Sequence, residues 1–289
     1  MTAEPRFLVC RPRGGFNDTL CEIEKCWRYA EATERRLIID SRRSGLHDDF
    51  WRYFKARDPF VHILGKLGDE GSDHDVMPRA VAGQLNAYVA EYDESVCNFV
   101  EQHTRQRLTF DFSVDHASRI LVHEQCWFGE FVSPYCVARI TLRDEVRIRV
   151  NEALSVLGGG AYTAIHIRNT DYRTDYPAFL NTIKSSITHE KVLICSDDFE
   201  VFSYAADLFR DKLVIRLSRF ADNGGVPLHS AARHDQFADN VDLLADLLGL
   251  ALSDQLMFTN VQSMPRASGF SMLAHALNRN QHLIRGEWL

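Results

Sequence analysis

The chain has 289 residues, of which 45% are hydrophobic and 25% are charged, the proportions of an ordinary globular protein. This length fits two domains or one large α/β domain. The net charge of −7 argues against a protein that binds nucleic acid through bulk charge, and the sequence contains no run of 18 apolar residues that would predict a membrane-spanning helix.

The cysteines and the N-terminus indicate the compartment. The first six residues lack the apolar core of a signal peptide. The seven cysteines include no C-x-x-C pair, so neither a disulfide framework nor a cysteine zinc site is expected. Cys10, Cys97, Cys136 and Cys195 have apolar or aromatic neighbours, which indicates reduced, buried thiols. We therefore predict a cytoplasmic protein without a metal site. A peripheral contact with a membrane is compatible with this sequence, which does not indicate an oligomeric state.

The N-terminal part opens with a βαβ pattern. Residues 7–10 and 37–40 are apolar runs that predict strands, and the segment between them has the apolar spacing of an amphipathic helix that ends near residue 35. Asn17 or Asp18 is the expected N-cap of that helix. Strand, loop, helix and strand predict the opening of a Rossmann-like domain.

A glycine-rich loop joins the first strand to the helix. Gly14 and Gly15 would let the backbone approach a ligand closely, and the N–H groups at the helix N-terminus would favour an anion or a sugar diphosphate. The loop does not match G-x-G-x-x-G, so the dinucleotide fingerprint is absent. A tight turn that needs glycine is the alternative interpretation.

Residues 41–110 carry weaker signals. Residues 41–60 are rich in Arg, Asp and aromatic side chains, which suits a loop and a short helix near an acceptor site or a packed cap. Residues 65–78 predict a surface loop. This loop contains Asp73, His74 and Asp75, a D-x-D pattern that some glycosyltransferases use to hold a metal, but its polar surroundings favour a solvated loop.

A domain boundary is predicted by three consecutive glycines. The apolar run 120–123 predicts a strand, and residues 141–157 look helical. Gly158, Gly159 and Gly160 end that helix and give the strongest boundary signal in the chain. We therefore expect an N-terminal domain at 1–158 and a C-terminal domain at 159–289.

The second half continues an α/β rhythm of four strands, each followed by a helix or a loop and a helix. Pro177 is expected at the first position of the first of these helices. The strands are predicted at 163–168, 191–195, 213–215 and 255–259, and the helices at 177–188, 199–209, 237–252 and 270–278.

Polar side chains gather at three element ends in this half. Arg168 and Asp171 could form an ordinary surface ion pair, and Asp198, Ser268 or Ser271 could simply cap helices. Taken together, however, these groups predict a sugar-nucleotide pocket, because ligands of open α/β sheets bind at the carboxyl ends of strands. The three groups are His166, Arg168 and Asp171; Ser196, Asp197 and Asp198; and Ser268, Gly269, Phe270 and Ser271.

Four stretches resemble one enzyme family. Residues 165–172, Ile-His-Ile-Arg-Asn-Thr-Asp-Tyr, look like the H-x-R-x-x-D signature of the GDP-fucose-dependent fucosyltransferases. That superfamily includes the α1,2-, α1,6- and protein O-fucosyltransferases and the nodulation-factor fucosyltransferase. Residues 14–17, 195–198 and 267–271 resemble its glycine loop and its second and third donor motifs, and the four motifs occur in the family's order.

The resemblance implies a GT-B fold, in which two Rossmann-like domains face each other across a cleft, and a metal-independent, inverting transfer of fucose from GDP-fucose to a glycan hydroxyl. Arg168 would hold the β-phosphate, His166 would bind the donor, and Asp197 or Asp198 would hold the nucleotide. Ser271 and the Phe270 backbone would contact the phosphates, while Gly15 and Asn17 would approach the donor from the other domain. The partners are then a nucleotide sugar and a glycan acceptor, with no cofactor beyond the donor.

The general base is open between Asp171 and Asp18, and a dissociative reaction needs only a weak base. The sequence also departs from the family pattern, because Asn169 stands where many members have a second Arg and Thr170 where some have Gly. A GT-B enzyme that uses another GDP-sugar and a non-catalytic sugar-nucleotide or glycan-binding protein therefore remain alternatives. A Rossmann oxidoreductase would need the missing G-x-G-x-x-G loop, although Asp40 lies near the expected position of a ribose-binding acid.

Overall fold

The computed structural model describes residues 4–58, 63–64, 75–127, 129–171, 173–219, 235–260, 267–286 and 288–289. The chain divides into two compact units, Met1–Thr141 and Leu142–Leu289. The expected boundary after residue 158 differs from this division because helix α3 (Asp144–Ser155) packs against helix α6 (Gln236–Ala251) of the second unit. Its buried side chains Val146 and Val150 therefore place α3 in the second core rather than the first.

The first unit is built on a parallel sheet with the strand order β4-β2-β1-β8-β5. The predicted βαβ opening is confirmed, because β1 and β2 pair in parallel through helix α1. The central elements are β1 (Phe7–Cys10), α1 (Phe16–Ala32), β2 (Arg36–Ile39) and β8 (Ile120–His123), and the edge strands are β4 (Ile63–Leu64) and β5 (Val76–Met77).

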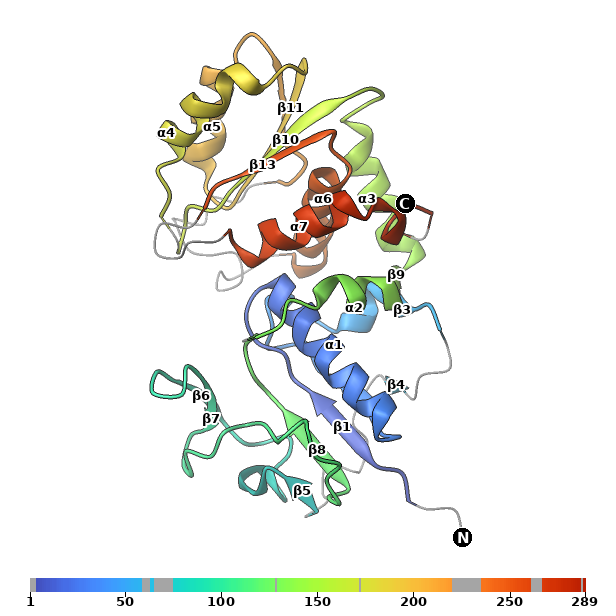
Figure 1. Ribbon diagram of the computed structural model, residues 1–289. Coiled ribbons are helices and arrows are strands. Elements are labelled where there is room, and N and C mark those ends of the chain that lie inside the picture. The colour runs from blue at the N-terminus through green and yellow to red at the C-terminus, as the bar shows by residue number, and fades with distance from the viewer. Residues whose placement is uncertain are drawn as a thin grey trace. The chain divides into compact units, whose positions relative to one another are not determined.

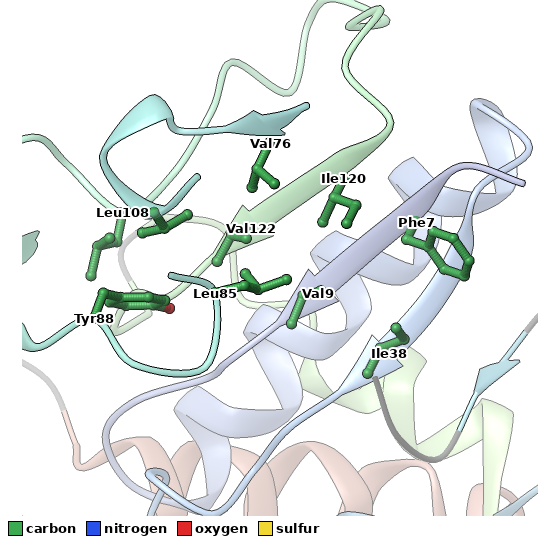
Figure 2. Close-up of a cluster of buried hydrophobic side chains, with 10 residues drawn as sticks. Phe7, Val9, Ile38, Val76, Leu85, Tyr88, Leu108, Ile120 and Val122 are labelled. Atoms are coloured by element: carbon green, nitrogen blue, oxygen red, sulfur yellow. The ribbon is translucent and has the colours of Figure 1, made fainter. Parts of the chain in front are cut away.

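An irregular segment covers one face of this sheet. Figure 2 shows Val9 of β1 and Val122 of β8 in one cluster with Leu85 and Tyr88. The last two precede an antiparallel hairpin of strands β6 (Ala90–Asp93) and β7 (Asn98–Glu101). Helix α1 packs on β1 and β2 and presents its buried apolar side chains to them. The sheet is therefore buried on both faces, as its continuous apolar strands require.

Helix α1 begins at Phe16, with Gly15 as its N-cap, so the expectation of Asn17 or Asp18 at the cap is wrong. The Asp18 carboxylate instead accepts a hydrogen bond from the Gly15 N–H at 3.3 Å, from the third position of the helix. Asn17 is buried, and its side-chain oxygen accepts a bond from the Ser133 hydroxyl at 2.7 Å. Both polar side chains thus stabilise the start of the helix from within its first turn.

The second unit contains a four-stranded parallel sheet with the order β12-β11-β10-β13. Helices α4 and α5 cover one face, while α6 and α7 cover the other (Figure 1). This confirms the predicted α/β rhythm, although Pro177 is the second residue of its helix rather than the first. The elements are β10 (Tyr162–Ile167), α4 (Tyr176–Ile183), β11 (Lys191–Ser196), α5 (Phe199–Leu208), β12 (Leu213–Ile215), β13 (Gln255–Phe258) and α7 (Gly269–Arg279).

Shorter elements complete the described chain. They are the strands β3 (Phe54–Ala56) and β9 (Ile140–Leu142), the helix α2 (Ser133–Arg139), and single 3₁₀ turns at Phe50–Arg52, Arg79–Val81, Lys184–Ser186 and Gln281–Leu283. Across the described ranges, no helix combines the length and apolarity needed to cross a bilayer.

The thiols largely follow the sequence prediction. Cys10, Cys136 and Cys195 are buried and free, and burial raises the pKa of each thiol well above its ordinary value. Cys97 is also free but exposed, so its predicted burial is wrong. It lies just before β7 with a positive φ of 50°, because the chain turns there between the two strands of the hairpin.

Candidate functional site

Two parallel strands of the second unit end side by side and carry polar residues past their ends. Ile167 of β10 is in register with Ser196 of β11, so Arg168 and Asp197 leave the sheet at the same edge. The carboxyl ends of parallel strands are where open α/β sheets bind ligands. The predicted convergence of the first two polar groups is therefore present.

Arg168 is held by carboxylates. Its Nε and Nη2 each donate to one oxygen of Asp171, both at 2.7 Å, and its Nε also lies 3.6 Å from Asp197 Oδ2. The side chains of Arg168 and Asp171 are 21% and 27% exposed. This fork-to-fork pair fixes the plane of the guanidinium while leaving part of it accessible to a ligand. The ion pair that was the plain alternative is thus real, and it orients the arginine.

Asp197 organises the turn after β10. Its Oδ1 accepts the backbone N–H of Asn169 at 2.8 Å, and its Oδ2 accepts the Thr170 hydroxyl at 2.5 Å. The Asn169 amide also donates to Asp198 Oδ2 at 2.7 Å. Asn169 and Thr170, which were noted only as departures from the family pattern, therefore tie the two strand ends together.

The remaining groups of the β11 end have capping contacts. Asp198 is the N-cap of α5 and accepts the Glu200 N–H at 3.0 Å, as expected. The Ser196 hydroxyl oxygen accepts the Asp198 N–H at 3.2 Å. These bonds make the turn between β11 and α5 rigid, so the carboxylates of Asp197 and Asp198 keep their positions at the sheet edge.

The start of α7 joins this edge through His166. Ser268 caps the helix by accepting the Ser271 N–H at 3.2 Å, and the Ser271 hydroxyl lies 2.6 Å from His166 Nδ1. The rings of His166 and Phe270 are 5.2 Å apart between centroids. The third predicted group, including Gly269 as the first residue of α7, therefore contacts the first.

The charge of this site comes from Arg168 and the helix N-terminus. Burial, helped by the nearby Arg168 charge, lowers the pKa of His166 to about 3, so its imidazole is neutral near pH 7. The first N–H groups of α7 have no acceptor within the helix and carry a partial positive charge. A neutral hydrogen-bonding ring, one guanidinium and a helix N-terminus form a site suited to an oxyanion.

The four predicted residues of the first unit gather separately around the start of α1. Gly14 has a φ of +84°, and a Cβ added there would lie 2.5 Å from Asp18 Oδ2. The Gly14 carbonyl oxygen accepts the Gly45 N–H at 2.7 Å. Glycine is required at position 14 by both conformation and space, which supports the turn interpretation without removing the ligand interpretation.

A buried carboxylate behind this loop was missed in the sequence. Glu124 is completely buried and accepts hydrogen bonds from Arg13, Arg43 and the Tyr88 hydroxyl. It follows strand β8 directly, and a charged residue immediately after an apolar strand was the available signal. Glu124 positions Arg13 of the glycine loop and Arg43 of the loop after β2.

Of the candidate metal pattern, the described part of the chain contains Asp75. Asp73 and His74 lie outside the described residues, whereas the Asp75 carboxylate accepts the Arg119 N–H at 3.0 Å. In the ranges that the structure describes, no three or more His, Cys, Asp or Glu side chains group as metal ligands.

Comparisons with known proteins agree with the fold. No protein-family model matches the chain. The chain is 23% identical to nodulation protein Z of Sinorhizobium fredii over an alignment of 264 residues, covering 78% of this chain and 79% of that protein. It superposes on the crystal structure of the fucosyltransferase NodZ from Bradyrhizobium with a TM-score of 0.66 and 21% identity, over 95% of this chain and 94% of that one.

A further match is a crystal structure of NodZ α1,6-fucosyltransferase soaked with GDP-fucose, with a TM-score of 0.65 and 21% identity, over 95% of this chain and 93% of that one. The chain therefore has the GT-B fold of these fucosyltransferases. The resemblance suggested by four short motifs is confirmed, and it extends over almost the whole chain.

Proposed function

We propose that this protein is a glycosyltransferase that moves fucose from GDP-fucose to a hydroxyl group of a glycan, with inversion at the anomeric carbon and without a metal. One observation carries the proposal. Arg168 follows the end of β10, where His166, two residues before it, lies 2.6 Å from the Ser271 hydroxyl at the N-terminus of α7, in a fold shared with a structure soaked with GDP-fucose. The second unit is then the donor-binding domain and the first the acceptor-side domain.

The reaction needs a positive site for the leaving group. The acceptor oxygen forms a bond to the anomeric carbon while the bond from that carbon to the β-phosphate oxygen breaks. GDP leaves with the electron pair, so negative charge builds on the diphosphate. Arg168 and the N–H groups at the start of α7 would stabilise this charge with dipoles already in place. The neutral His166 would donate or accept a hydrogen bond without competing for the phosphate charge.

The acceptor proton must leave during transfer. Asp171 and Asp18 are the candidate bases, but each has a bond that favours a positioning role. Asp171 forms the bidentate pair with Arg168, and Asp18 accepts the Gly15 N–H. We therefore propose that Asp171 mainly orients the guanidinium and that a weak base or water accepts the proton, as a dissociative transition state permits.

The other predicted donor contacts follow the same scheme. Ser196, Asp197 and Asp198 would border the nucleotide, and Ser268, Gly269, Phe270 and Ser271 would surround the phosphates. Gly14, Gly15 and Asn17 would approach the diphosphate and the sugar from the first unit. A cytoplasmic location also stays a prediction, and it would place the enzyme where GDP-sugars are available.

The donor is tested by binding and by turnover. GDP should raise the melting temperature more than UDP or CDP, and GDP-fucose should be consumed in preference to GDP-mannose. Arg168→Ala should lower kcat/KM by about 10²–10³-fold, the usual loss on removing a donor to a developing anion. Arg210→Ala is the matched control, because Arg210 is exposed beyond the end of α5.

Each outcome separates the candidate functions. A shift specific for UDP or CDP would refute the GDP-sugar assignment. Turnover of GDP-mannose in place of GDP-fucose would keep the fold and the site but change the donor. Binding of GDP with no transfer to any acceptor in a glycan array would identify a binding protein. Near-normal turnover of the Arg168→Ala variant would remove the proposed role of Arg168.

A further inference from the structure

Two arginines of the first unit share one buried carboxylate. Glu124 is completely buried, and its Oε1 accepts a hydrogen bond from Arg13 Nε at 2.8 Å and another from Arg43 Nη1 at 3.3 Å. Arg13 Nη2 donates to the same oxygen, while the Tyr88 hydroxyl donates to the other oxygen, Oε2. Two guanidinium groups therefore crowd around a single negative charge, and one positive charge is left over.

Arg13 is held on several sides. Its backbone N–H donates to the Gln125 carbonyl at 2.9 Å, and its guanidinium carbon lies 4.5 Å from the centroid of the Phe99 ring. The Arg13 side chain is nevertheless 17% exposed, and its Nη1 makes no hydrogen bond within the described part of the chain. Because Nε, Nη2 and one face of the guanidinium are engaged, the position of Nη1 is fixed while its N–H groups stay available to a ligand.

Arg43 approaches the same carboxylate from the loop after β2. Its side chain is 41% exposed, and its guanidinium carbon lies 5.9 Å from the centroid of the Tyr88 ring. Nε and Nη2 of Arg43 have no hydrogen-bond acceptor in the ranges that the structure describes. Because both guanidinium groups contact one carboxylate oxygen, these two nitrogen atoms and Arg13 Nη1 are close enough to donate to one ligand.

The second arginine is not explained by a purely structural ion pair. A buried carboxylate needs partners, but Arg13 and the Tyr88 hydroxyl already supply hydrogen bonds to both oxygens of Glu124. Arg43 adds repulsion between like charges, and an ion pair with an exposed partner contributes little to stability. A bound anion would offset this repulsion, so the pair of arginines indicates a ligand site.

Other carboxylates near this group have their own partners. Asp40 pairs with two other arginines, and Asp18 accepts the Gly15 N–H at 3.3 Å. Among the described residues, Glu124 is the one carboxylate that forms an ion pair with either arginine of this site. The positive charge that is left over can therefore be balanced by an anionic ligand.

We propose that Arg13 and Arg43 bind a phosphate group, with Glu124 as the residue that positions them. The planar guanidinium fork suits phosphate oxygens, and the ligand supplies the second negative charge that the two arginines lack. Two sources have this chemistry, the diphosphate of a nucleotide sugar and a phosphate group carried by an acceptor. The site itself does not rest on the proposed function, although both of these sources do.

Pyrophosphate is the probe, and the full chain with the Arg168→Ala substitution is the starting protein, because this change removes the arginine of the other proposed phosphate site. Isothermal titration calorimetry at low ionic strength measures the dissociation constant, since salt screens exposed charges. Arg43→Gln removes one guanidinium and leaves Glu124 paired with Arg13. Arg36→Gln is the matched control, because Arg36 is exposed at the other end of β2.

We expect pyrophosphate to bind to the starting protein, and Arg43→Gln to raise the dissociation constant about tenfold, the usual effect of losing a hydrogen bond to a charged group. Arg36→Gln should leave it unchanged. Arg13→Gln should have a larger effect than Arg43→Gln, and thermal unfolding shows whether this variant is folded; if it is not, Arg43→Gln decides alone. The proposal is overturned if pyrophosphate does not bind, if Arg43→Gln leaves the dissociation constant unchanged, or if Arg36→Gln weakens binding equally.

Binding of GDP to the protein with Arg168 intact identifies the source of the phosphate. A donor phosphate predicts that Arg43→Gln weakens GDP binding about tenfold and that GDP displaces pyrophosphate. An acceptor phosphate predicts unchanged GDP binding in Arg43→Gln and binding of pyrophosphate to the GDP-saturated protein. Because pyrophosphate carries neither nucleoside nor sugar, the first assay succeeds or fails independently of whether GDP-fucose is the donor.

Discussion

The contribution of His166 to the stability of the second unit should be lost in acid. The folded-state pKa of His166 is lowered from 6.5 to about 3, so the unfolded chain binds its proton first as the pH falls. The stabilising contribution of the neutral ring is fully present above pH 6.5 and is lost toward pH 3. Its full size is about 5 kcal/mol, or about 1.4 kcal/mol for each pH unit.

A second buried group in the same unit works in the opposite direction. Burial raises the pKa of Asp246 on α6 from 3.8 to about 7, so the folded state binds this proton more tightly than the unfolded chain does. The contribution of Asp246 is fully present below pH 3.8 and is lost as the pH rises through 7. Between pH 3.8 and 6.5, the slopes from His166 and Asp246 therefore nearly cancel.

In a variant that lacks one of the two groups, the dependence of the unfolding free energy on pH should come from the other group alone. Between pH 6.5 and pH 5, the free energy of unfolding of His166→Gln should rise by about 2 kcal/mol relative to the wild-type protein, and that of Asp246→Asn should fall by about 2 kcal/mol. Urea titrations at each pH, followed by fluorescence, give these values. The second unit has a single tryptophan, Trp288, which is buried and so reports its unfolding.

The reasoning is refuted if all three proteins show the same dependence of unfolding free energy on pH. Parallel curves would mean that neither side chain changes its proton affinity on folding. A reversed order of the two variants would mean that His166 is charged in the folded state. The bond between His166 and Ser271 could then not belong to a neutral ring.

Three further results are expected. In thermal unfolding, Gly14→Ala should destabilise the first unit by about 1–3 kcal/mol, because it combines a φ of +84° with a methyl group 2.5 Å from a carboxylate oxygen. Gly15→Ala should cost less than about 1 kcal/mol in the same measurement. Ser268→Ala removes the cap of α7 and should cost about 0.5–2 kcal/mol in urea unfolding, and full stability would show that the cap bond is not made. Asp171→Asn keeps the shape of the side chain but weakens its ion pair with Arg168. The KM for GDP-fucose should therefore change, with a smaller loss of kcat than in Arg168→Ala. A loss of kcat as large as that of Arg168→Ala, with KM unchanged, would instead identify Asp171 as the base.

The α/β order of the chain could be predicted because its main strands are apolar runs and its helices have a clear apolar period. The segments 7–39 and 162–215 show this well, since each strand and each connecting helix buries a face that can be recognised locally. Residues 75–110 could not be predicted in the same way. Strand β5 has only two residues, and it exists because β8 supplies its hydrogen bonds.

The donor-side candidates could be found because each lies directly after an apolar strand or before a helix. Their bonds could not be predicted. Ser271 lies 105 residues from His166, so their contact depends on how helix α7 packs beside strand β10 in the folded unit. The partners of Glu124 could not be predicted for the same reason, because Arg13 is 111 residues away. The position of Glu124 directly after an apolar strand is visible in the sequence, but its burial depends on those distant partners.

The contact between Gly45 and the glycine loop has a consequence for engineering. Residues 41–49 contribute five side chains to a cavity of about 620 Å³ at the ends of β1 and β2, so exchanging this segment would change its lining. A Cβ at position 45 would lie 3.0 Å from the Gly14 carbonyl oxygen and 3.2 Å from Gly15 Cα. A grafted loop must therefore keep glycine at this one position, whatever it changes at Arg42, Arg43, Asp48 or Asp49. Libraries that randomise the segment but preserve Gly45 would vary the cavity without disturbing the turn that precedes α1.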